Sequence, residues 1–400
     1  MSELSYLEKL LDGVEVEWRT LGEIAVIYDG THKTPKYTAS GVPFVSVQNI
    51  KNLYGTNKYI SPEDFKTYKN KPRKHDLFMT RIGDVGTCAI VEDDRPLAYY
   101  VTLALIRINQ QIAVPGFIRY LIESRFGKAE LYKRTLIHAV PMKINLGEIG
   151  KVAVPIPCPD NPEKSLAIQS EIVRILDKFS ALTAELTAEL TAELNMRKKQ
   201  YNYYRDQLLS FKEGEVEWKT LGTFADNFDS LRKPITSGLR ETGNIPYYGA
   251  SGIVDYVKDY IFDDDLLLIS EDGANLIARN TPIAFSISGK TWVNNHAHVL
   301  KFKNYTEQKF VEYYLNNINL TPYISGAAQP KLNKKNLESI RIPNPSLKEK
   351  EQIVTILDKF DTLTNSITEG LPREIELRQK QYEYYRDLLF SFPKPETVSN

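Results

Sequence analysis

Residues 175–194 read ILDKFSALTAELTAELTAEL, and this stretch decides the fold. Its last twelve residues are three consecutive Thr-Ala-Glu-Leu units that begin at Thr183. Because Ala, Glu and Leu are strong helix formers, the stretch is predicted to be a stiff helix. Each four-residue step turns a helix by about 400°, so the leucine stripe drifts by about 40° per unit. The alanine in each unit widens the apolar face and accommodates that drift.

Apolar residues continue at three- and four-residue steps on both sides of this stretch, so a single helix is predicted over residues 166–209. The same stripe returns 181 residues later with its spacing unchanged. There Gly370 and Pro372 interrupt it, which predicts a weakened or kinked helix. The two helices are expected to pack antiparallel through Leu182, Leu186, Leu190, Leu194, Leu363, Ile367, Leu371 and Ile375.

Three motifs occur twice in the chain: EVEW(R/K)TLG at 15–22 and 215–222, ILDKF at 175–179 and 356–360, and QY(N/E)YYRD at 200–206 and 381–387. The first pair is shifted by 200 residues and the other two by 181, so the helical part has kept its length while the segment before it has not. The intervening residues 23–154 and 223–342 share little identity. This alternation of variable and constant parts favours a spacer role for the helices, and a simple bundle core is the alternative.

The N-terminal residues resemble the end of the first long helix, because YLEKLL at 6–11 matches the pattern of YRDQLL at 204–209. The first residues of the chain are therefore predicted to complete its constant region. Read as a ring, the sequence has two-fold symmetry, and its two ends are expected to lie near each other.

The composition restricts the class of protein. Lysine plus arginine and aspartate plus glutamate both number 51, so the formal net charge is zero, although a balanced total can hide separate patches. The sequence contains no 18-residue apolar stretch and no basic leader, so neither a transmembrane helix nor a signal peptide is expected. Cys88 and Cys158 are the only cysteines, which excludes a disulfide framework and favours a cytoplasmic location.

The variable segments have the pattern of mixed α/β domains, in which short apolar runs are separated by Gly and Asn and are followed by a helix. The predicted strands are 43–47, 76–80, 87–91 and 103–107 in the first segment and 245–248, 266–270, 283–287 and 298–302 in the second. The predicted helices are 115–133 and 307–317. The shared order predicts one fold with two different surfaces.

The predicted fold class is α/β (α+β), with two copies of one domain and two long antiparallel helices that form a coiled-coil-like spacer in a circular pseudo-two-fold arrangement. The predicted parts are an N-terminal segment of the constant region at 1–22, a first variable domain at 23–157, a central helix at 158–213, a second variable domain at 214–345, a C-terminal helix at 346–392 and a tail at 393–400.

Basic residues gather in both variable domains. Five lie between residues 65 and 75 without an intervening acid, and three lysines at 331, 334 and 335 follow Gln329 and flank Asn333. Lysine and arginine neutralise phosphates, and Gln, Asn and Arg hydrogen-bond with base edges. A solvated charged loop is the alternative for any one cluster. Two clusters in equivalent halves favour double-stranded DNA as the partner.

These features resemble the specificity subunit of type I restriction-modification systems over nearly the whole chain. The resemblance rests on the variable–constant alternation and on LDKF at 176–179, QYNYYR at 200–205, GTHKTP at 30–35, GAAQPKLN at 326–333 and IPNP at 342–345. The tandem Thr-Ala-Glu-Leu units resemble those of the type IC group. The first domain departs from the pattern, because it has AVPMKIN at 139–145 where the second has the fuller Gln-Pro-Lys motif.

The resemblance implies that each variable domain is a target recognition domain that reads one half of a bipartite DNA site. The nonspecific spacer between the halves would be about six to eight base pairs. Two modification subunits would dock on the helices and methylate adenine with S-adenosylmethionine. Restriction subunits would add ATP- and Mg-dependent translocation and cleavage. The chain itself is expected to be non-catalytic and to bind neither cofactor nor metal.

Two sets of residues are predicted to contact these partners. The candidate DNA-binding residues are Thr31, His32, Lys33, Lys36, Lys69, Lys71, Arg73, Lys74, Arg81, Lys143, Asn145, Arg232, Lys233, Tyr248, Ser251, Gln329, Lys331, Asn333, Lys334 and Lys335. The candidate residues of the spacer and partner surface, beyond the apolar stripe, are Tyr201, Tyr204, Arg205, Tyr382, Tyr385 and Arg386.

Several segments resemble catalytic motifs without meeting their requirements. SGKT at 288–291 ends like a phosphate-binding loop, but Ala284 stands where the loop needs glycine. His296 and His298 lack a Cys or acidic neighbour at metal-ligand spacing, which favours a packing or DNA-surface role. Cys88 lies in a strand-like run and is expected to be buried. The Asn/Asp-Pro-Pro-aromatic loop of adenine methyltransferases does not occur in the sequence.

Two other classes of function stay open. A structural scaffold would use the helices to present two protein-binding domains, and salt-sensitive binding to a two-part DNA sequence distinguishes the specificity subunit from it. A self-contained enzyme would bind S-adenosylmethionine or ATP as an isolated chain, and the missing motifs weigh against it.

Overall fold

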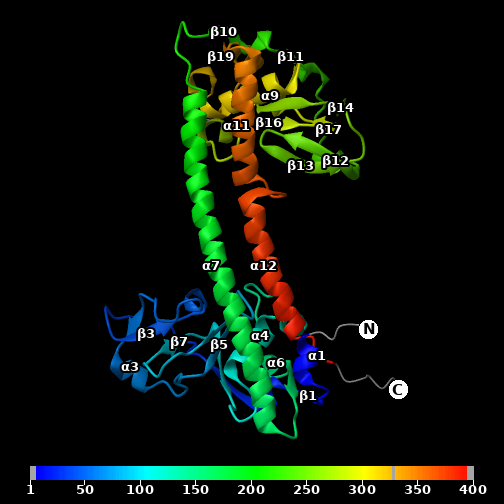
Figure 1. Cartoon of the computed structure of the whole chain (residues 1–400). Helices are drawn as coiled ribbons and strands as arrows, with labels where there is room; N and C mark the ends of the chain where they lie inside the picture. The colour runs from blue at the N-terminus through cyan, green and yellow to red at the C-terminus, as the bar shows by residue number, and fades with distance from the viewer. Residues whose placement is uncertain (1–5, 327–328, 394–400) are drawn as a thin grey trace. The chain divides into compact units, whose positions relative to one another are not determined.

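The computed structural model describes residues 6–326 and 329–393 and is shown in Figure 1. The chain divides into two compact units. Unit 1 comprises Met1–Glu189 and Ile375–Asn400, and unit 2 comprises Leu190–Glu374. Unit 1 therefore combines the first variable domain with a segment from the far end of the chain, whereas unit 2 is continuous in sequence.

The strands of unit 1, coloured blue to green in Figure 1, form three sheets. The first is antiparallel with the order β2 (Ala25–Asp29), β8 (Leu103–Ile108), β5 (Leu77–Thr80) and β6 (Cys88–Ile90). The second has the order β4 (Tyr59–Ile60), β3 (Val42–Val45) and β7 (Ala98–Tyr99), with β3 and β7 parallel. The third pairs β1 (Val16–Thr20) with β9 (Ala153–Pro157).

The strands of unit 2 repeat this plan. The first sheet has the order β11 (Ala225–Asn227), β18 (Ala297–Phe302), β15 (Leu266–Ser270) and β16 (Ala284–Ile287). The second has the order β13 (Gly252–Val257), β12 (Thr242–Gly249), β17 (Lys290–Val293) and β14 (Phe262–Asp263), and the third pairs β10 (Glu217–Thr220) with β19 (Arg341–Asn344). The predicted strands are thus confirmed, and so is the prediction that the two variable domains share one fold.

Some of the shorter helices fall at equivalent places in the two units: α4 and α9 follow β8 and β18, and α6 and α10 precede β9 and β19. Unit 1 has α1 (Tyr6–Leu11), α2 (Leu21–Ile24), α3 (Pro62–Lys66), α4 (Pro115–Glu123), α5 (Arg125–Tyr132) and α6 (Leu146–Ile149). Unit 2 has α8 (Asn275–Ala278), α9 (Tyr305–Asn317) and α10 (Lys334–Glu338). Short 3-10 helices lie at Val47–Asn49, Leu221–Thr223, Asp229–Leu231, Ser237–Leu239 and Thr321–Tyr323. The predicted helix 115–133 is divided at Ser124, whose side chain caps α5.

The central strand of each main sheet is buried on both faces. In β5, Leu77 and Met79 belong to the core that contains Phe117 of α4, whereas Phe78 belongs to the core on the opposite face. A strand covered on both faces needs apolar residues at every position rather than at alternate ones. This explains why the strands appear in the sequence as continuous apolar runs.

The first long helix, α7, runs from Pro162 to Leu208 and is 47 residues long. Its length is about 70 Å at 1.5 Å per residue, and the predicted single helix is confirmed. None of the helices in the described part of the chain has the length and apolar character that crossing a bilayer requires.

The C-terminal helix predicted at 346–392, weakened or kinked at Gly370 and Pro372, is interrupted completely. The structure has α11 (Leu347–Asn365) and α12 (Gly370–Leu389), with a non-helical break between them. Gly370 has a φ of 82°, and Pro372 lies in the first turn of α12, where proline is tolerated. Ile367 lies in the break and is 79% exposed, so it does not belong to the predicted apolar stripe.

The repeated motifs of the helices pack against each other within each unit. In unit 1 the ring of Phe179 stacks on that of Tyr385, with centroids 5.3 Å apart. In unit 2 the ring of Tyr204 stacks on that of Phe360 at 5.7 Å. The 181-residue shift relates Phe179 to Phe360 and Tyr204 to Tyr385. Each ILDKF motif therefore contacts the QYxYYRD motif of the other half of the sequence.

The end of the described chain completes unit 1. Phe390 and Phe392 are buried. The ring centroids of Phe392 and Phe117 are 6.0 Å apart. In unit 2 the ring centroids of Phe211, the counterpart of Phe392, and Phe310 are 6.2 Å apart. The indole N–H of Trp18 donates to the carbonyl of Pro393 at 2.8 Å, which confirms that the two end segments meet.

Helix α1 does not take the place that sequence similarity gave it. The Tyr385–Phe179 stack and the position of Phe392 show that residues 385–392 stand in unit 1 where residues 204–211 stand in unit 2. Residues 385–392 thus fill the position that sequence similarity gave to α1. Helix α1 packs beside them as an additional element. The interpretation of residues 6–11 as the counterpart of 204–209 is therefore wrong.

Candidate nucleic-acid interface

A charged network lies in each variable domain where the central strand of the main sheet ends. Strand β5 ends at Thr80 and is followed by Arg81, and β15 ends at Ser270 and is followed by Glu271. The two positions are equivalent, because both strands pair in the same order with their neighbours. The network is therefore centred on a cation in unit 1 and on an anion in unit 2.

In unit 1 the guanidinium of Arg81 connects three segments of the chain. Its Nε donates to the carbonyl of Val101 at 2.9 Å, its Nη1 to the carbonyl of Ile144 at 3.2 Å, and its Nη2 to the carboxylate of Asp29 at 3.1 Å. The residue is 7% exposed. We therefore correct the prediction that Arg81 contacts DNA, because all three nitrogens are occupied inside the protein.

In unit 2 the guanidinium of Arg232 has the corresponding role. Its Nη1 donates to Glu271 at 2.6 Å and to the carbonyl of Ala297 at 2.7 Å, and its Nε donates to the carbonyl of Asp229 at 3.0 Å. Its side chain is largely buried. The prediction that Arg232 contacts DNA is corrected for the same reason.

His298 joins this network from β18 and is buried. Its Nδ1 lies 2.6 Å from Asp229 Oδ2 and its Nε2 lies 2.7 Å from the carbonyl of Leu332. Both partners offer acceptor oxygens, so a ring nitrogen that carries a proton donates to the partner it faces. The expected packing role of His298 is confirmed. Its acidic partner was missed because Asp229 lies 69 residues away in the sequence.

The two carboxylates of this network stay ionised although their side chains are largely removed from solvent. Burial by itself raises the pKa of Asp229, but the hydrogen bond and the charge of His298 outweigh it and lower the pKa below its usual 3.8. Burial likewise raises the pKa of Glu271, and the hydrogen bond from Arg232 lowers it below 4.5. Asp229, Glu271 and His298 are close enough to hold a metal ion, but Arg232 supplies the cation that pairs with both carboxylates.

Two loops close over these networks and present a lysine each. We call residues 135–145 lysine loop 1 and residues 325–333 lysine loop 2, of which 327 and 328 lie outside the described residues. Lys143 forms β-bridges with Ile82 and Leu136, and Lys331 forms equivalent bridges with Asp272 and Ser325. Both lysines are exposed. The structure therefore places Lys143 and Lys331 at the same point of the two domains.

The asparagines that follow these lysines begin short helices. Asn145 precedes α6 and is exposed, without a side-chain hydrogen bond to the helix. Asn333 precedes α10, and its side-chain oxygen accepts from the backbone N–H of Asn336 at 3.0 Å. Gln329, Lys334 and Lys335 are exposed on lysine loop 2 and α10. Asn333 thus serves as a helix cap, and Lys334 pairs with Glu338 of the same helix at 3.7 Å.

Two further candidates of unit 1, Thr31 and Lys69, line a hollow of about 240 Å³ between two segments of the chain. Thr31 lines it from one segment, and Tyr68 and Lys69 line it from the other. His32 is exposed beside it, and its Nε2 lies 2.9 Å from Asp29, which also pairs with Arg81. The charged network thus extends from the core to the surface at this hollow.

The other basic residues of unit 1 have mixed environments. Lys33, Lys36, Arg73 and Lys74 are exposed. Lys71 is half-buried, with its ammonium group 4.9 Å from the centre of the Phe65 ring. The exposed members are free to meet a phosphate, whereas Lys71 is partly engaged within the protein.

The remaining candidates of unit 2 lie on the adjoining sheet and its turns. Lys233 and Ser251 are exposed, and Tyr248 is half-buried on β12. The hydroxyl of Ser270 donates to the carbonyl of Ala250, which brings the turn at Ser251 next to Glu271. Lys331 Nζ lies 3.2 Å from Glu271, so this edge joins the turn, the network and lysine loop 2.

Lysine loop 1 exposes apolar side chains that sequence reasoning missed. Val140 is fully exposed, and Leu136, Ile137 and Met142 are each more than a third exposed. The signal was the run LIHAVPM, which has the composition of a core segment but lies in a loop between two helices. Apolar groups beside a lysine suit contact with thymine methyl groups or an unstacked base step.

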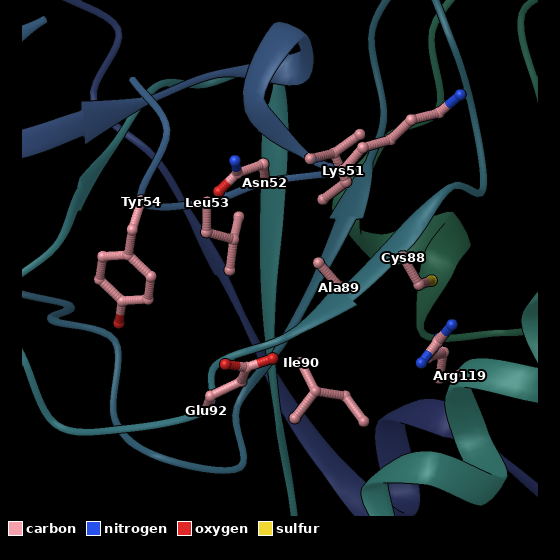
Figure 2. Close-up of a pocket in the computed structure, with 10 residues that line it drawn as sticks. Lys51, Asn52, Leu53, Tyr54, Cys88, Ala89, Ile90, Glu92 and Arg119 are labelled. Atoms are coloured by element: carbon pink, nitrogen blue, oxygen red, sulfur yellow. The ribbon is translucent and has the colours of Figure 1, made fainter. Parts of the chain in front are cut away.

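A hollow of about 300 Å³ beside β6 shows no catalytic arrangement (Figure 2). Cys88 and Arg119 line one side of it and Tyr54 the other. Burial raises the pKa of the Cys88 thiol well above 9.0, so the sulfur is protonated and is no nucleophile. The expected burial of Cys88 is confirmed. The segment 288–291 covers the turn between β16 and β17 and the first residues of β17, which differs from the strand-to-helix turn of a phosphate-binding loop.

The candidate residues of the helices fall into buried and exposed groups. Arg386 is buried and its guanidinium lies 5.7 Å from the Tyr382 ring, and Arg205 lies 5.6 Å from the Tyr201 ring. The stripe residues Leu186, Leu190, Leu194, Leu363, Leu371 and Ile375 are half-buried, and Leu182 is half exposed. The most exposed rings of the two tyrosine motifs are Tyr203 and Tyr384, which sequence reasoning did not select.

Comparison with known proteins relates the chain to one family over its whole length. A family model described as "Type I restriction modification DNA specificity domain" matches residues 13–196 and again 213–377. The specificity subunit of the Escherichia coli enzyme EcoR124I/EcoR124II is 43% identical over 100% of both chains. The E. coli EcoprrI specificity subunit is 41% identical over 92% of this chain and 93% of its own.

Solved structures share the fold. A chain reported under "Structural basis underlying complex assembly and conformational transition of the type I R-M system" has a TM-score of 0.60, at 16% identity and over 94% of this chain and 97% of its own. The HsdS subunit from Thermoanaerobacter tengcongensis has a TM-score of 0.50, at 17% identity and over 94% and 95% of the two chains. At these identities the likeness concerns the fold alone.

Proposed function

The chain belongs to the specificity subunits of type I restriction-modification systems, and we propose that each of its two variable domains reads one half of a bipartite DNA target. Specificity subunits confer DNA target recognition on the complex and are not catalytic. They assemble with modification and restriction subunits. The proposal concerns how this chain divides the recognition between its two domains.

The observation that carries the proposal is the equivalence of Lys143 and Lys331. Each lysine is exposed at the same β-bridge in one of two domains that share one fold. The surroundings differ: apolar side chains flank Lys143, whereas Lys331 lies beside Glu271. A common cation suits the phosphate backbone, and different neighbours suit different base edges.

The comparison of the two domains also supports two different roles for the charged side chains within each domain. Arg81 and Arg232 hold the network together from inside, and the exposed lysines, His32 and Gln329 form the outer layer. A rigid inner layer keeps the outer side chains in position, which base recognition requires. Specificity would then be altered by changes in the outer layer that leave the inner one intact.

We propose that α7 sets the length of the nonspecific spacer between the half-sites, about six to eight base pairs. It runs through both units, as the shorter α12 also does, and in α7 the boundary between the units lies within the Thr-Ala-Glu-Leu tandem. On the same ground we assign the chain to the type IC group. The helices would also carry the docking sites of two modification subunits.

We propose that S-adenosylmethionine, ATP and Mg are held by the partner subunits, which supply the methylation and the translocation. This chain's part is to bind and position DNA. We further propose a cytoplasmic location, because the DNA target and the partner subunits lie there.

The test is the methylation pattern that the chain directs. The chain is expressed with the modification subunit of its system in a host without adenine methylation, and the methylated adenines are located by sequencing. We expect one two-part motif with a fixed spacer. Absence of any motif, together with protein binding by the variable domains, would support the scaffold alternative instead.

A domain exchange tests whether each domain reads one half-site. Residues 23–154 are replaced by the corresponding segment of a relative with a different target. We expect a change in one half-site and no change in the other. A change in both half-sites would refute the assignment of one half-site to each domain.

A further inference from the structure

Lysine loop 1 is attached to the end of β5 by two backbone hydrogen bonds. The N–H of Ile144 donates to the carbonyl of Arg81 at 3.0 Å. The N–H of Gly83 donates to the carbonyl of Met142 at 2.8 Å. Because Arg81 is itself held by the charged network, the base of the loop has a fixed position in unit 1.

Lysine loop 2 is attached to the end of β15 by the same two bonds. The N–H of Leu332 donates to the carbonyl of Glu271 at 2.8 Å. The N–H of Gly273 donates to the carbonyl of Pro330 at 3.1 Å, so Pro330 stands where unit 1 has Met142. Leu332 is the one large aliphatic residue in the sequence of loop 2, and it is buried.

The tips of the two loops differ in chemistry although their bases agree. Each tip is closed by a backbone hydrogen bond of 2.8 Å, from Leu136 to Lys143 in loop 1 and from Ser325 to Lys331 in loop 2. The enclosed residues read IHAVPM at 137–142 and GAAQP at 326–330. The tip of loop 2 therefore offers the amide of Gln329, whereas the tip of loop 1 offers aliphatic side chains.

The aliphatic side chains of loop 1 are presented to solvent. Val140 is 100% exposed, and Leu136, Ile137 and Met142 are 48%, 40% and 37% exposed. Folding normally removes such side chains from water, so their gathering on one loop marks a surface that another molecule covers.

The charge around the tip fits DNA as the covering molecule. Lysine loop 1 contains no acidic residue in its sequence. Lys143 is exposed at the point that corresponds to Lys331, and the side chain of Lys133, just before the loop, is 67% exposed although it pairs with Glu130. An apolar tip between cations matches a polyanion with an apolar interior, which is the base stack of DNA between its phosphates.

We propose that the tip of lysine loop 1 inserts Val140 between two stacked base pairs of its half-site, whereas loop 2 reads its half-site without insertion. The inference rests on the proposed function, since it takes unit 1 as the reader of one half-site. Aliphatic wedges of this kind kink a duplex by roughly 20–90°. Three residues extend at most about 10 Å from the closing bond, against a groove depth of about 8 Å, so the tip can reach the stack.

The two half-sites are then recognised by different means. The amide of Gln329 can hydrogen-bond with a base edge in the half-site of unit 2. The wedge of unit 1 instead responds to how easily a base step opens, and pyrimidine–purine steps open most readily. The half-site of unit 1 is therefore expected to contain such a step.

Fluorescence of 2-aminopurine tests the proposal, because this adenine analogue brightens when its neighbours no longer stack on it. The analogue replaces one base at a time in a duplex that carries the target, and the full chain is bound together with the modification subunit of its system. We expect brightening at one step of the half-site of unit 1 that disappears in V140S and persists in V140L. The affinity of V140S for the target should fall about tenfold. An adenine that leaves the stack for methylation also brightens, but it should do so in both half-sites and in every variant.

V26S is the matched control, since Val26 is a half-exposed valine on β2 of the same unit. Equal brightening at every step in the wild type and V140S, or the same loss in V26S, would refute the insertion. If V140S weakened binding of the modification subunit in the absence of DNA, the tip would be a protein contact and the proposal would be wrong. A chain that directs no two-part motif would refute the proposed function itself, whereas a motif without a step that depends on Val140 refutes the insertion alone.

Discussion

Removal of one Thr-Ala-Glu-Leu unit from α7 is expected to shorten the DNA spacer by one base pair. Deleting residues 187–190 takes four residues out of a continuous helix. The helix becomes about 6 Å shorter, and its far end turns back by about 40° beyond a full turn. In the C-terminal constant segment, the non-helical residues 366–369 between α11 and α12 can adjust to the new length.

DNA offers a definite match for this change. One base pair contributes a rise of about 3.4 Å and a right-handed twist of about 35°. Removal of one base pair therefore matches the rotation within about 5° and leaves a length error of about 2.6 Å. Removal of two matches the length within about 1 Å but leaves about 30° of rotation, which displaces contacts 10 Å from the axis by about 5 Å. Removal of one base pair therefore leaves the smaller combined mismatch in length and rotation.

The assay is the methylation motif of the deletion variant, determined by sequencing as for the parent chain. We expect the same half-site letters with a spacer one base pair shorter. Insertion of a fourth unit is the matched control and should lengthen the spacer by one. A changed half-site, or an unchanged spacer in both variants, would show that α7 does not set the distance.

Three further predictions concern the charged networks. K331Q is expected to weaken DNA binding for every sequence and to reduce the slope of log K against log salt by about one, measured by titration at several salt concentrations; a change of preferred letters with the slope unchanged would contradict a phosphate contact. R232M removes the closest partner of Glu271 and is expected to destabilise unit 2 by about 3 kcal/mol, seen as faster hydrogen exchange in β15 and β18 with exchange in β5 unchanged. Because the folded pKa values of Asp229 and Glu271 lie below their usual 3.8 and 4.5, the stability they contribute is present above pH 4.5 and is lost as the pH falls through the folded values. Acid unfolding of unit 2 should therefore be less steep in D229N than in the wild type, and an equal steepness would contradict this assignment.

Much of the fold could be predicted because its signals are local. The strands are apolar runs bounded by turn residues, and α7 consists largely of strong helix formers. Gly370 and Pro372 also indicated the weak point between α11 and α12, although they could not show that the helix ends there. The pairings β1–β9 and β10–β19 were not predicted, because each joins segments more than 100 residues apart.

The site was harder to predict because charge in a sequence does not reveal burial. Arg81 and Arg232 are residue types that commonly contact DNA, yet each pairs with a carboxylate far away in the sequence and donates to backbone carbonyls. Lys143 and Lys331 are exposed in the structure, and their contact with DNA stays a prediction. Helix α1 was misassigned because sequence similarity does not show which of two similar segments occupies a position.

The order of synthesis matters for a chain whose first unit is completed by its last described residues. Phe390, Phe392 and Pro393 complete the surroundings of Phe117 and Trp18. At about 5–20 residues per second, the ribosome needs roughly 10–40 s after residue 189 to make them. Unit 2 is contiguous and can fold within that time, whereas unit 1 waits with its core open. The half of the protein that is translated first is thus the half that finishes folding last.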